Sequence, residues 1–296
     1  MKTEPLKLVV LGTGGRLGAT LARGFAAEAQ VTGFNRSQLD LTSAEALERE
    51  LGRLDFEVLL NCAGTTSPDY CETHEDEAFA VNAHAVRKIG EICLRKGARC
   101  LHFSTDYVFD GEKNWDCTEE DAAEPVNVYG ASKRQGEVEL LGLSAESHLA
   151  IRVSWVFGTD APGFVDQILR KAMAGEKLEA VADKWTKPTF ARDILERLRP
   201  FLRELPAGGV LHLTQGGPAC SWLEYGQYAL DCAAALGVPL KSRSIAPRRM
   251  AEIPAFIAKR PVYTGMATRR LEELTGCAAR PWKEAVAEYI RKHYAP

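Results

Sequence analysis

The sequence predicts an α/β fold in which a doubly wound parallel sheet carries a smaller C-terminal lobe. Short, nearly continuous apolar runs alternate with amphipathic segments of helical periodicity over the first two thirds of the chain. Such runs are typical of parallel strands that helices cover on both faces. A glycine-rich turn directly follows the first run, and the last third mixes helical segments with Pro- and Gly-rich connections. These observations favour one nucleotide-binding type of sheet with an added lobe.

The first elements follow from local patterns. The apolar run LKLVVL predicts a strand over residues 6–11, and Gly12 ends it. Apolar residues four positions apart then predict a helix over 16–29, and a second strand follows over 31–34. The hydroxyl groups of Thr42 and the residue after it can cap the next helix.

The alternation continues along the chain. The further strands of the sheet are predicted at 58–60, 100–104, 150–156 and 210–214. Amphipathic helices are predicted between them at 77–96 and 128–141. In the last third, helices are predicted at 163–175, 221–236 and 281–294. We expect this last part to pack on the carboxyl edge of the sheet, where ligands bind in such folds.

Composition excludes several classes of function. The 296 residues are 46% hydrophobic and 26% charged, which is typical of a globular protein with a full core. A net charge of −3 gives no sign of a nucleic-acid partner or an anionic membrane surface. No apolar stretch approaches the roughly 20 residues that cross a bilayer, and the eight cysteines form no Cys-x-x-Cys pair. We therefore expect a cytoplasmic protein with reduced thiols.

The turn after the first strand is the first candidate for binding chemistry. Glycines at this place let the backbone approach a pyrophosphate, whose charge the N-terminus of the next helix stabilises. The cofactor-binding candidates in the turn are Gly12, Gly14, Gly15, Arg16, Leu17 and Gly18.

The end of the second strand bears on the choice of dinucleotide. An acidic residue there commonly binds a ribose 2′-hydroxyl, whereas an arginine accommodates a 2′-phosphate. The chain has Asn35 and Arg36 at this point, with no acid before Asp40. Arg36 could pair with the 2′-phosphate of NADP, and Arg16 could assist it. The alternative is that Arg36 is a solvated surface residue.

A tyrosine and a lysine form the second candidate. Tyr129 and Lys133 are four positions apart on a predicted helix, so they share a face and can address one site. A tyrosine becomes a useful proton donor or acceptor near neutral pH when a nearby cation favours its phenolate. Ser104 and Thr105 end a predicted parallel strand, where catalytic side chains gather in α/β sheets. A hydroxyl there could bind a carbonyl oxygen together with Tyr129.

These segments together resemble the extended short-chain dehydrogenase/reductase superfamily. Within it, the chain is most similar to the dTDP-4-dehydrorhamnose reductase family. The matching segments run almost from end to end: GTGGRLG (12–18), LDLT (39–42), NCAG (61–64), VNA (81–83), FSTDYVFDG (103–111), VYGASKRQGE (128–137), IRVSWVFG (151–158), KPTFARDI (187–194) and RPVYTGM (260–266).

The resemblance implies an architecture and a set of roles. It implies an NADP-binding Rossmann domain over 1–157, to which 188–217 return, and a substrate-binding lobe over 218–296 with a contribution from 158–187. Thr105, Tyr129 and Lys133 match the catalytic triad. Further matching positions are Asp40 and Leu41 at the adenine, Cys62, Ala63 and Gly64 beside the pyrophosphate and nicotinamide ribose, and Tyr107 and Trp155 facing the sugar.

The resemblance also implies partners and leaves alternatives open. It implies NADP as cofactor, with NAD as the alternative, and a nucleotide-sugar substrate. A homodimer is one option for the oligomeric state, which the sequence leaves open. Some family members bind a metal through acids of the first helix; residues 16–27 contain none, so we predict no metal. The six histidines show no metal-ligand spacing, and we expect core or surface roles for them.

One departure from the family pattern affects the substrate. A usual Asp-Gln-x-Gly-x-Pro-Thr stretch is replaced by DKWTKPT at 183–189, which would place Lys184 and Lys187 near the cleft. With this change the chain also resembles a sister group, the cofactor-binding regulatory β subunit of methionine adenosyltransferase, which is an alternative to a reductase. Another nucleotide-sugar epimerase, reductase or dehydratase is a further alternative. Dehydratases usually follow the catalytic threonine with Asp-Glu, and here Asp106 and Tyr107 follow it.

Overall fold

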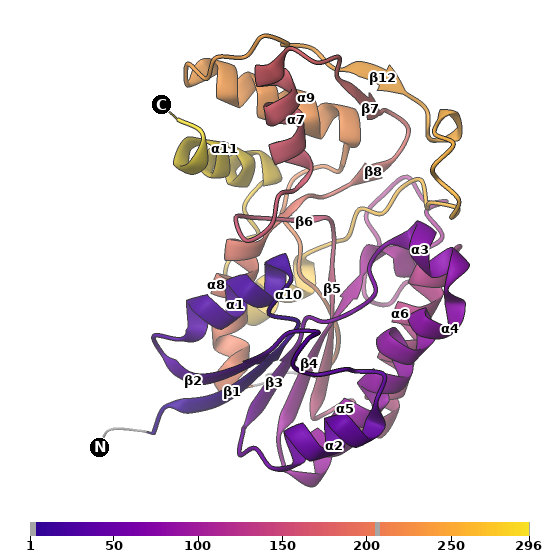
Figure 1. Cartoon of the computed structure of the whole chain (residues 1–296), viewed down its shortest axis with the longest axis vertical. Coiled ribbons are helices and arrows are strands. Elements are labelled where there is room, and N and C mark those ends of the chain that lie inside the picture. Colours follow the sequence, from indigo (N-terminus) through magenta and orange to yellow (C-terminus); the bar gives the residue numbers. More distant parts are fainter. Residues whose placement is uncertain (1–3, 205–207, 296) are drawn as a thin grey trace.

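The computed structural model describes residues 4–204 and 208–295. Its centre is a six-stranded sheet in the order β10-β5-β4-β3-β1-β2, in which every neighbouring pair is parallel (Figure 1). The strands are β1 (Leu6–Leu11), β2 (Ala29–Phe34), β3 (Val58–Asn61), β4 (Arg99–Thr105), β5 (His148–Val153) and β10 (Gly209–His212). The predicted fold class, an α/β protein with a parallel sheet, is confirmed.

Helices cover both faces of this sheet, and the side chains of β1 show why. Leu8 and Val10 pack into the core under α1 (Arg16–Phe25) and α8 (Ala191–Arg203), whereas Val9 and Leu11 face the opposite core. The helices on that second face are α2 (Ala44–Gly52), α5 (Ala85–Arg95) and α6 (Val128–Leu143). Each fully buried aliphatic side chain of this kind contributes about 1.5–3 kcal/mol.

A second core lies in the C-terminal lobe, which Figure 1 shows beyond one end of the sheet. Its helices are α7 (Phe164–Ala174), α9 (Trp222–Ala235) and α11 (Trp282–His293), close to the predicted ranges. Three short strand pairs complete it: β6 (Val156–Phe157) with β9 (Thr189–Phe190), β7 (Glu179–Val181) with β12 (Ala246–Arg248), and β8 (Trp185–Thr186) with β11 (Cys220–Ser221). The domain boundaries at 157 and 218 stay a prediction.

The helix predicted over 77–96 is divided in the structure. It consists of α4 (Glu75–Phe79), a π-helical turn η1 (Ala80–His84) and α5. The wider turn carries the buried Asn82, whose amide donates to the carbonyl of Thr65 (2.9 Å) and to Ser132 Oγ (3.0 Å). Such π-turns are frequent at functional sites, and this one holds the loop after β3 against α6.

The strand predicted over 150–156 is also interrupted. β5 ends at Val153, and the chain turns at Trp155, which has a positive φ of 37°. A positive φ is strained for a residue with a bulky side chain. The turn separates β5 in the central sheet from β6 in the lobe, so Trp155 lies where the two parts meet.

Smaller differences concern the ends of elements and three helices. The first helix ends at Phe25 rather than 29, and the last strand of the sheet ends at His212 rather than 214. The helices α3 (Pro68–Thr73), α8 and α10 (Arg269–Thr275) were not among the predicted elements.

Candidate active site

A cavity of about 770 Å³ lies between the carboxyl ends of the strands and the C-terminal lobe. Every site residue predicted from the sequence lines it: Gly12, Gly14, Gly15, Arg16, Leu17, Gly18, Asn35, Arg36, Asp40, Leu41, Cys62, Ala63, Gly64, Thr105, Tyr107, Tyr129, Lys133 and Trp155. The fold therefore brings together residues that lie up to 143 positions apart in the sequence, from Gly12 to Trp155.

The glycine turn is shaped partly by packing and partly by the cavity. A Cβ on Gly18 would lie 2.2 Å from the Gly12 carbonyl oxygen, and one on Gly12 would lie 2.7 Å from the Ala63 nitrogen. These two glycines are required by close packing. A Cβ on Gly14 or Gly15 would meet no protein atom closer than 3.4 Å, so the space they leave open belongs to the cavity.

This turn fits a pyrophosphate. Gly15 is the N-cap of α1, no side chain caps the helix, and its first turn contains no acidic residue. The first N–H groups of a helix and its dipole attract negative charge. The residues present thus fit the phosphate groups of a dinucleotide.

The far end of the cavity holds the residues after β2. Arg36 has a side chain that is 92% exposed and forms a surface ion pair with Glu77 (3.2 Å). Asp40 accepts hydrogen bonds from the backbone N–H (2.9 Å) and hydroxyl (2.8 Å) of Thr42, and the hydroxyl bond is the main cause of its lowered pKa. The Asp40 carboxylate is therefore hydrogen-bonded within its own turn, whereas the Arg36 side chain is held only by one exposed ion pair.

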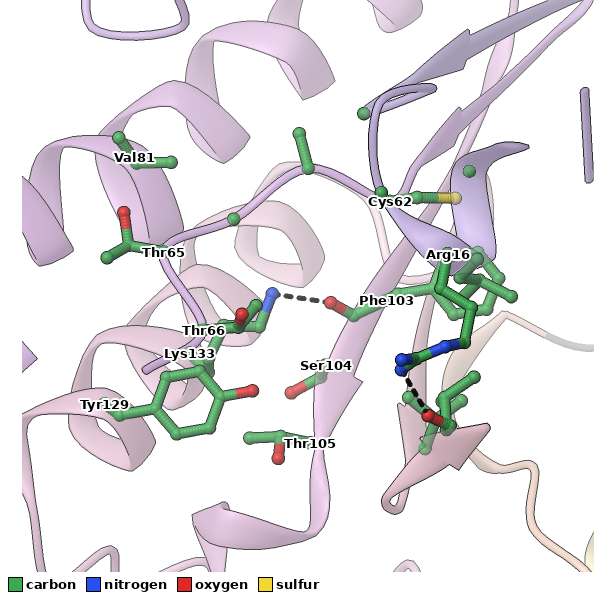
Figure 2. Close-up of a pocket in the computed structure, with 18 of the residues that line it drawn as sticks. Arg16, Cys62, Thr65, Thr66, Val81, Phe103, Ser104, Thr105, Tyr129 and Lys133 are labelled. Carbon is green, nitrogen blue, oxygen red and sulfur yellow. Dashed lines mark hydrogen bonds between the residues drawn. The ribbon is translucent and has the colours of Figure 1, made fainter. Parts of the chain in front are cut away.

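Arg16 has a different environment from the one expected. Its guanidinium makes four hydrogen bonds of 2.8–3.1 Å to the carbonyl groups of Val156, Ala161 and Pro162, and Figure 2 shows one of the bonds of Arg16 as a dashed line. Arg16 lines the cavity, but its donors are directed at the segment that enters the lobe.

The catalytic candidates Thr105 and Tyr129 come together because α6 approaches the end of β4 closely. A Cβ on Gly130 would lie 2.1 Å from the Tyr107 carbonyl oxygen, so only glycine allows this approach. Asn127 caps α6 by accepting a hydrogen bond from the Gly130 N–H (2.8 Å). Figure 2 shows the Tyr129 hydroxyl directed toward Ser104 and Thr105. Burial raises the pKa of Tyr129, and the neighbouring Thr105 hydroxyl partly opposes the rise.

Lys133 lies one helical turn farther along α6 and is almost completely buried. Its ammonium donates to the carbonyl oxygen of Phe103 (2.5 Å; Figure 2) and lies 3.1 Å from His102 Nε2. Burial lowers the pKa of Lys133 to about 8, against the opposing influence of Glu137 and Cys62. An ammonium with two partners retains one N–H for a group in the cavity.

Ser104 and Asp106 differ in role from Thr105, although they flank it. Ser104 donates to the buried carboxylate of Glu137 (2.5 Å). The buried Asp106 accepts from Ser154 Oγ (2.8 Å) and Thr186 Oγ1 (3.0 Å), and from Thr105 Oγ1 (3.2 Å). Sequence reasoning did not single out Asp106 as a site residue, because its partners Ser154 and Thr186 come from distant segments.

The lobe side of the cavity is aromatic and carries one buried ammonium. The ring of Tyr107 lies 5.6 Å from that of Tyr129, and Lys184 Nζ lies 4.8 Å from the centre of the Tyr107 ring. Trp155 packs against Trp222, 4.8 Å between ring centres. Burial lowers the pKa of Lys184 to about 8.

Of the two lysines expected near the cleft, the structure places only Lys184 on it. Lys184 donates to the carbonyl of Pro261 (2.8 Å) and lines the cavity. Lys187 is instead buried against Asp116 and the carbonyl of Met266, away from the cavity lining.

An ion pair joins the two sides of the cavity beyond Tyr107. Arg260, which lines the cavity, pairs with Asp69 on α3, and Asp69 also accepts from the backbone N–H groups of Ile257 (2.8 Å) and Ala258 (3.0 Å). Hydrogen bonding to Arg260 and these N–H groups outweighs burial and lowers the pKa of Asp69.

Within residues 4–204 and 208–295, no group of three or more His, Cys, Asp or Glu side chains is arranged to hold a metal ion. In the same described part of the chain, no helix is both long and apolar enough to span a bilayer.

A parallel sheet of this topology, with a glycine turn after its first strand and a buried Tyr–Lys pair beside the cavity, defines an oxidoreductase of the short-chain dehydrogenase/reductase class. The chain belongs to the family described as RmlD substrate binding domain, which matches residues 6–295.

Individual relatives and a solved structure are similar to the chain over nearly its whole length. The chain is 33% identical over 296 residues to a dTDP-4-dehydrorhamnose reductase of Burkholderia thailandensis, covering 97% of this chain and 98% of the relative. It is 30% identical over 287 residues to the spore coat polysaccharide biosynthesis protein SpsK of Bacillus subtilis, covering 97% of each. A crystal structure of dTDP-4-dehydrorhamnose reductase from Bacillus anthracis in complex with NADP superposes with a TM-score of 0.90 at 26% identity, covering 97% of this chain and 99% of that one.

Proposed function

We propose that the protein uses NADPH to reduce the 4-keto group of dTDP-4-dehydro-L-rhamnose to the hydroxyl group of dTDP-L-rhamnose. The observation that carries the proposal is the meeting of Thr105, Tyr129 and Lys133 with the glycine turn on one cavity. Relatives named for this reaction, aligned over nearly the whole chain, support the choice of substrate.

NADP is the proposed cofactor, with NAD as the alternative. The open space at Gly14 and Gly15 and the uncapped start of α1 suit the pyrophosphate. Arg36 suits a 2′-phosphate, because its pair with Glu77 is an exposed surface contact that is easily exchanged. The NADP complex of the Bacillus anthracis relative supports this choice. When bound, the nicotinamide supplies the hydride.

The residues of the chain have complementary tasks in such a reduction. A carbonyl oxygen that gains negative charge needs a proton donor and a second hydrogen-bond donor. Tyrosine is protonated at neutral pH, as a general acid must be, and burial raises the pKa of Tyr129 further. The Thr105 hydroxyl donates to Asp106 and accepts from the Tyr107 N–H (3.2 Å each), so it would turn its single O–H from Asp106 to donate to the carbonyl oxygen. Lys133, whose other two N–H groups are directed at His102 and Phe103, would present its remaining N–H to the cofactor ribose.

The lobe side of the cavity supports a nucleotide-sugar. Tyr107 and Trp155 offer aromatic surfaces that can pack against the apolar face of a 6-deoxy sugar. Lys184 and Arg260 add cationic donors nearby. Binding energy from the nucleotide part would then position the reacting carbon.

The deciding experiment follows NADPH oxidation by the purified protein with dTDP-4-keto-6-deoxyglucose and its 3,5-epimerase. We expect rapid oxidation that depends on the epimerase and on the dTDP group. Reduction of the free keto sugar at the same rate would contradict the nucleotide-sugar assignment. Tight NADPH binding without any turnover would instead indicate the regulatory-subunit alternative.

A further inference from the structure

The contact between His102 and Lys133 is not explained by the roles assigned above. His102 lies on β4, its side chain faces α6, and none of its surface is exposed. Lys133 Nζ lies 3.1 Å from His102 Nε2, which is hydrogen-bond distance. Gly136 is required by the nearby backbone of Asn82, since a Cβ there would lie 2.1 Å from the Asn82 carbonyl oxygen, whereas its distance of 3.6 Å from His102 Nε2 would be an ordinary contact.

The chemistry of the two groups sets the direction of this hydrogen bond. An ammonium only donates, so His102 Nε2 must accept, and the imidazole proton must be on Nδ1. Burial, and then the charge of Lys133, holds the pKa of His102 well below its usual value, so the ring is neutral. His102 is therefore an acceptor beside Lys133 and not a competing cation.

The other ring nitrogen shows that the arrangement is costly. His102 Nδ1 is buried and has no hydrogen-bond partner among the described residues. A buried donor without a partner loses its hydration and destabilises the folded state. An apolar side chain would avoid this cost, so packing alone gives no reason for histidine here.

We propose that His102 is a positioning residue, which together with the Phe103 carbonyl holds the Lys133 ammonium so that its third N–H faces the cavity. The proposal rests on the role of Lys133 in the proposed function. A hydrogen bond to the charged form also favours that form. The other groups around Lys133 are the Glu137 carboxylate and the Cys62 thiol, which favour the charge, and the neutral Tyr129.

Three variants test the proposal. His102→Phe removes the acceptor and keeps a ring, His102→Gln keeps an acceptor on a side chain long enough to reach Lys133, and His84→Phe is a control at an exposed position. We expect His102→Phe to move the alkaline limb of the kcat/KM profile down by about one pH unit. His102→Gln and His84→Phe should leave the limb near its parental position.

A second readout separates this proposal from the proposed function. The titration of Lys133 can be followed by NMR of ¹³C-labelled lysine, with the signal assigned by Lys133→Met. The same downward shift in His102→Phe is expected there, whether or not the sugar nucleotide is a substrate. Should His102→Phe fail to fold, His102→Asn, which is too short to reach Lys133, takes its place against His102→Gln. An unshifted Lys133 in the variant that lacks the acceptor, or an equal shift in His102→Gln, would overturn the proposal.

Discussion

Glu137 on α6 and Arg152 on β5 form a bidentate ion pair in the interior, with Nε–Oε1 at 2.9 Å and Nη2–Oε2 at 2.8 Å. The two side chains are 0% and 2% exposed. Burial alone would raise the pKa of Glu137, but the hydrogen bonds from Arg152 and Ser104 outweigh it and the pKa is lowered. This pair fixes α6, which carries Tyr129 and Lys133, to the strands that end at the cavity.

Replacing Glu137 by alanine should destabilise the protein by about 3–5 kcal/mol, because Arg152 would remain buried without its partner. Glu139→Ala on the same helix is the matched control. Glu139 pairs with the half-exposed Arg87, so its loss should cost at most about 1 kcal/mol. Urea unfolding measures both values. Equal losses of unfolding free energy in the two variants would show that the buried ion pair contributes no more to stability than the surface pair.

Tyr129→Phe should lower turnover at least ~100-fold, the usual scale for loss of a general acid. The Kd of NADPH should change little, since the phenol oxygen is removed and the ring remains. Tyr70→Phe, at a surface position where the hydroxyl donates to Glu77, is the control. Turnover of Tyr129→Phe within a few-fold of the parent would remove Tyr129 from the mechanism.

Arg36→Ala should weaken NADPH binding by about 1.5–3 kcal/mol and leave NADH binding unchanged, because only NADPH carries the 2′-phosphate. Glu77→Gln, which removes the surface partner of Arg36, should not weaken NADPH binding. Titration of both cofactors against the three proteins gives these affinities. If the parent bound both cofactors equally, Arg36 would be a solvated surface residue.

Activity should fall as the pH rises through about 8. Burial lowers the pKa of Lys133 to about 8, so the side chain is protonated and charged below that pH and loses its charge above it. The loss of one proton gives a limb of unit slope in log kcat/KM. A profile that stays flat well above pH 8 would mean that the charge of Lys133 is not needed.

Trp155→Ala should raise the KM for the sugar nucleotide with little effect on NADPH affinity. The same change should also lower stability, by less than the about 3–5 kcal/mol of a fully buried tryptophan, because the partly buried Trp155 packs against Phe164, Trp222 and Tyr225. Steady-state kinetics and thermal unfolding separate the two effects. An unchanged KM would leave Trp155 as a packing residue only.

Regular elements were predictable because their signals are local. The apolar runs and the helical spacing placed the sheet and α7, α9 and α11 within a few residues. The π-turn at Ala80–His84 was not predictable, since it depends on contacts of Asn82 with Thr65 and Ser132. The positive φ of Trp155 likewise follows from the junction of two cores and not from its own preference.

In the candidate site, too, local motifs were predictable and tertiary contacts were not. Motifs placed the glycine turn, Thr105, Tyr129 and Lys133 on one cavity. The sequence does not predict the partners of these residues. It predicts only a core or surface role for His102, and it predicts that Lys184 and Lys187 both lie near the cleft. Whether a buried charge lines a cavity or ties two loops together depends on tertiary packing, which no single segment encodes.

The two arginine links between the halves of the cavity differ in the charge of their acceptors. Arg16 donates only to neutral carbonyl groups, whereas Arg260 faces the carboxylate of Asp69, which is 26% exposed. Dissolved ions screen attraction between opposite charges, with a Debye length of about 8 Å at physiological ionic strength. The Asp69–Arg260 pair is a direct contact between partly buried side chains, which such screening weakens little, so added salt should leave both sides of the cavity largely intact. The shape of the cavity should then stay the same in solutions of very different ionic strength.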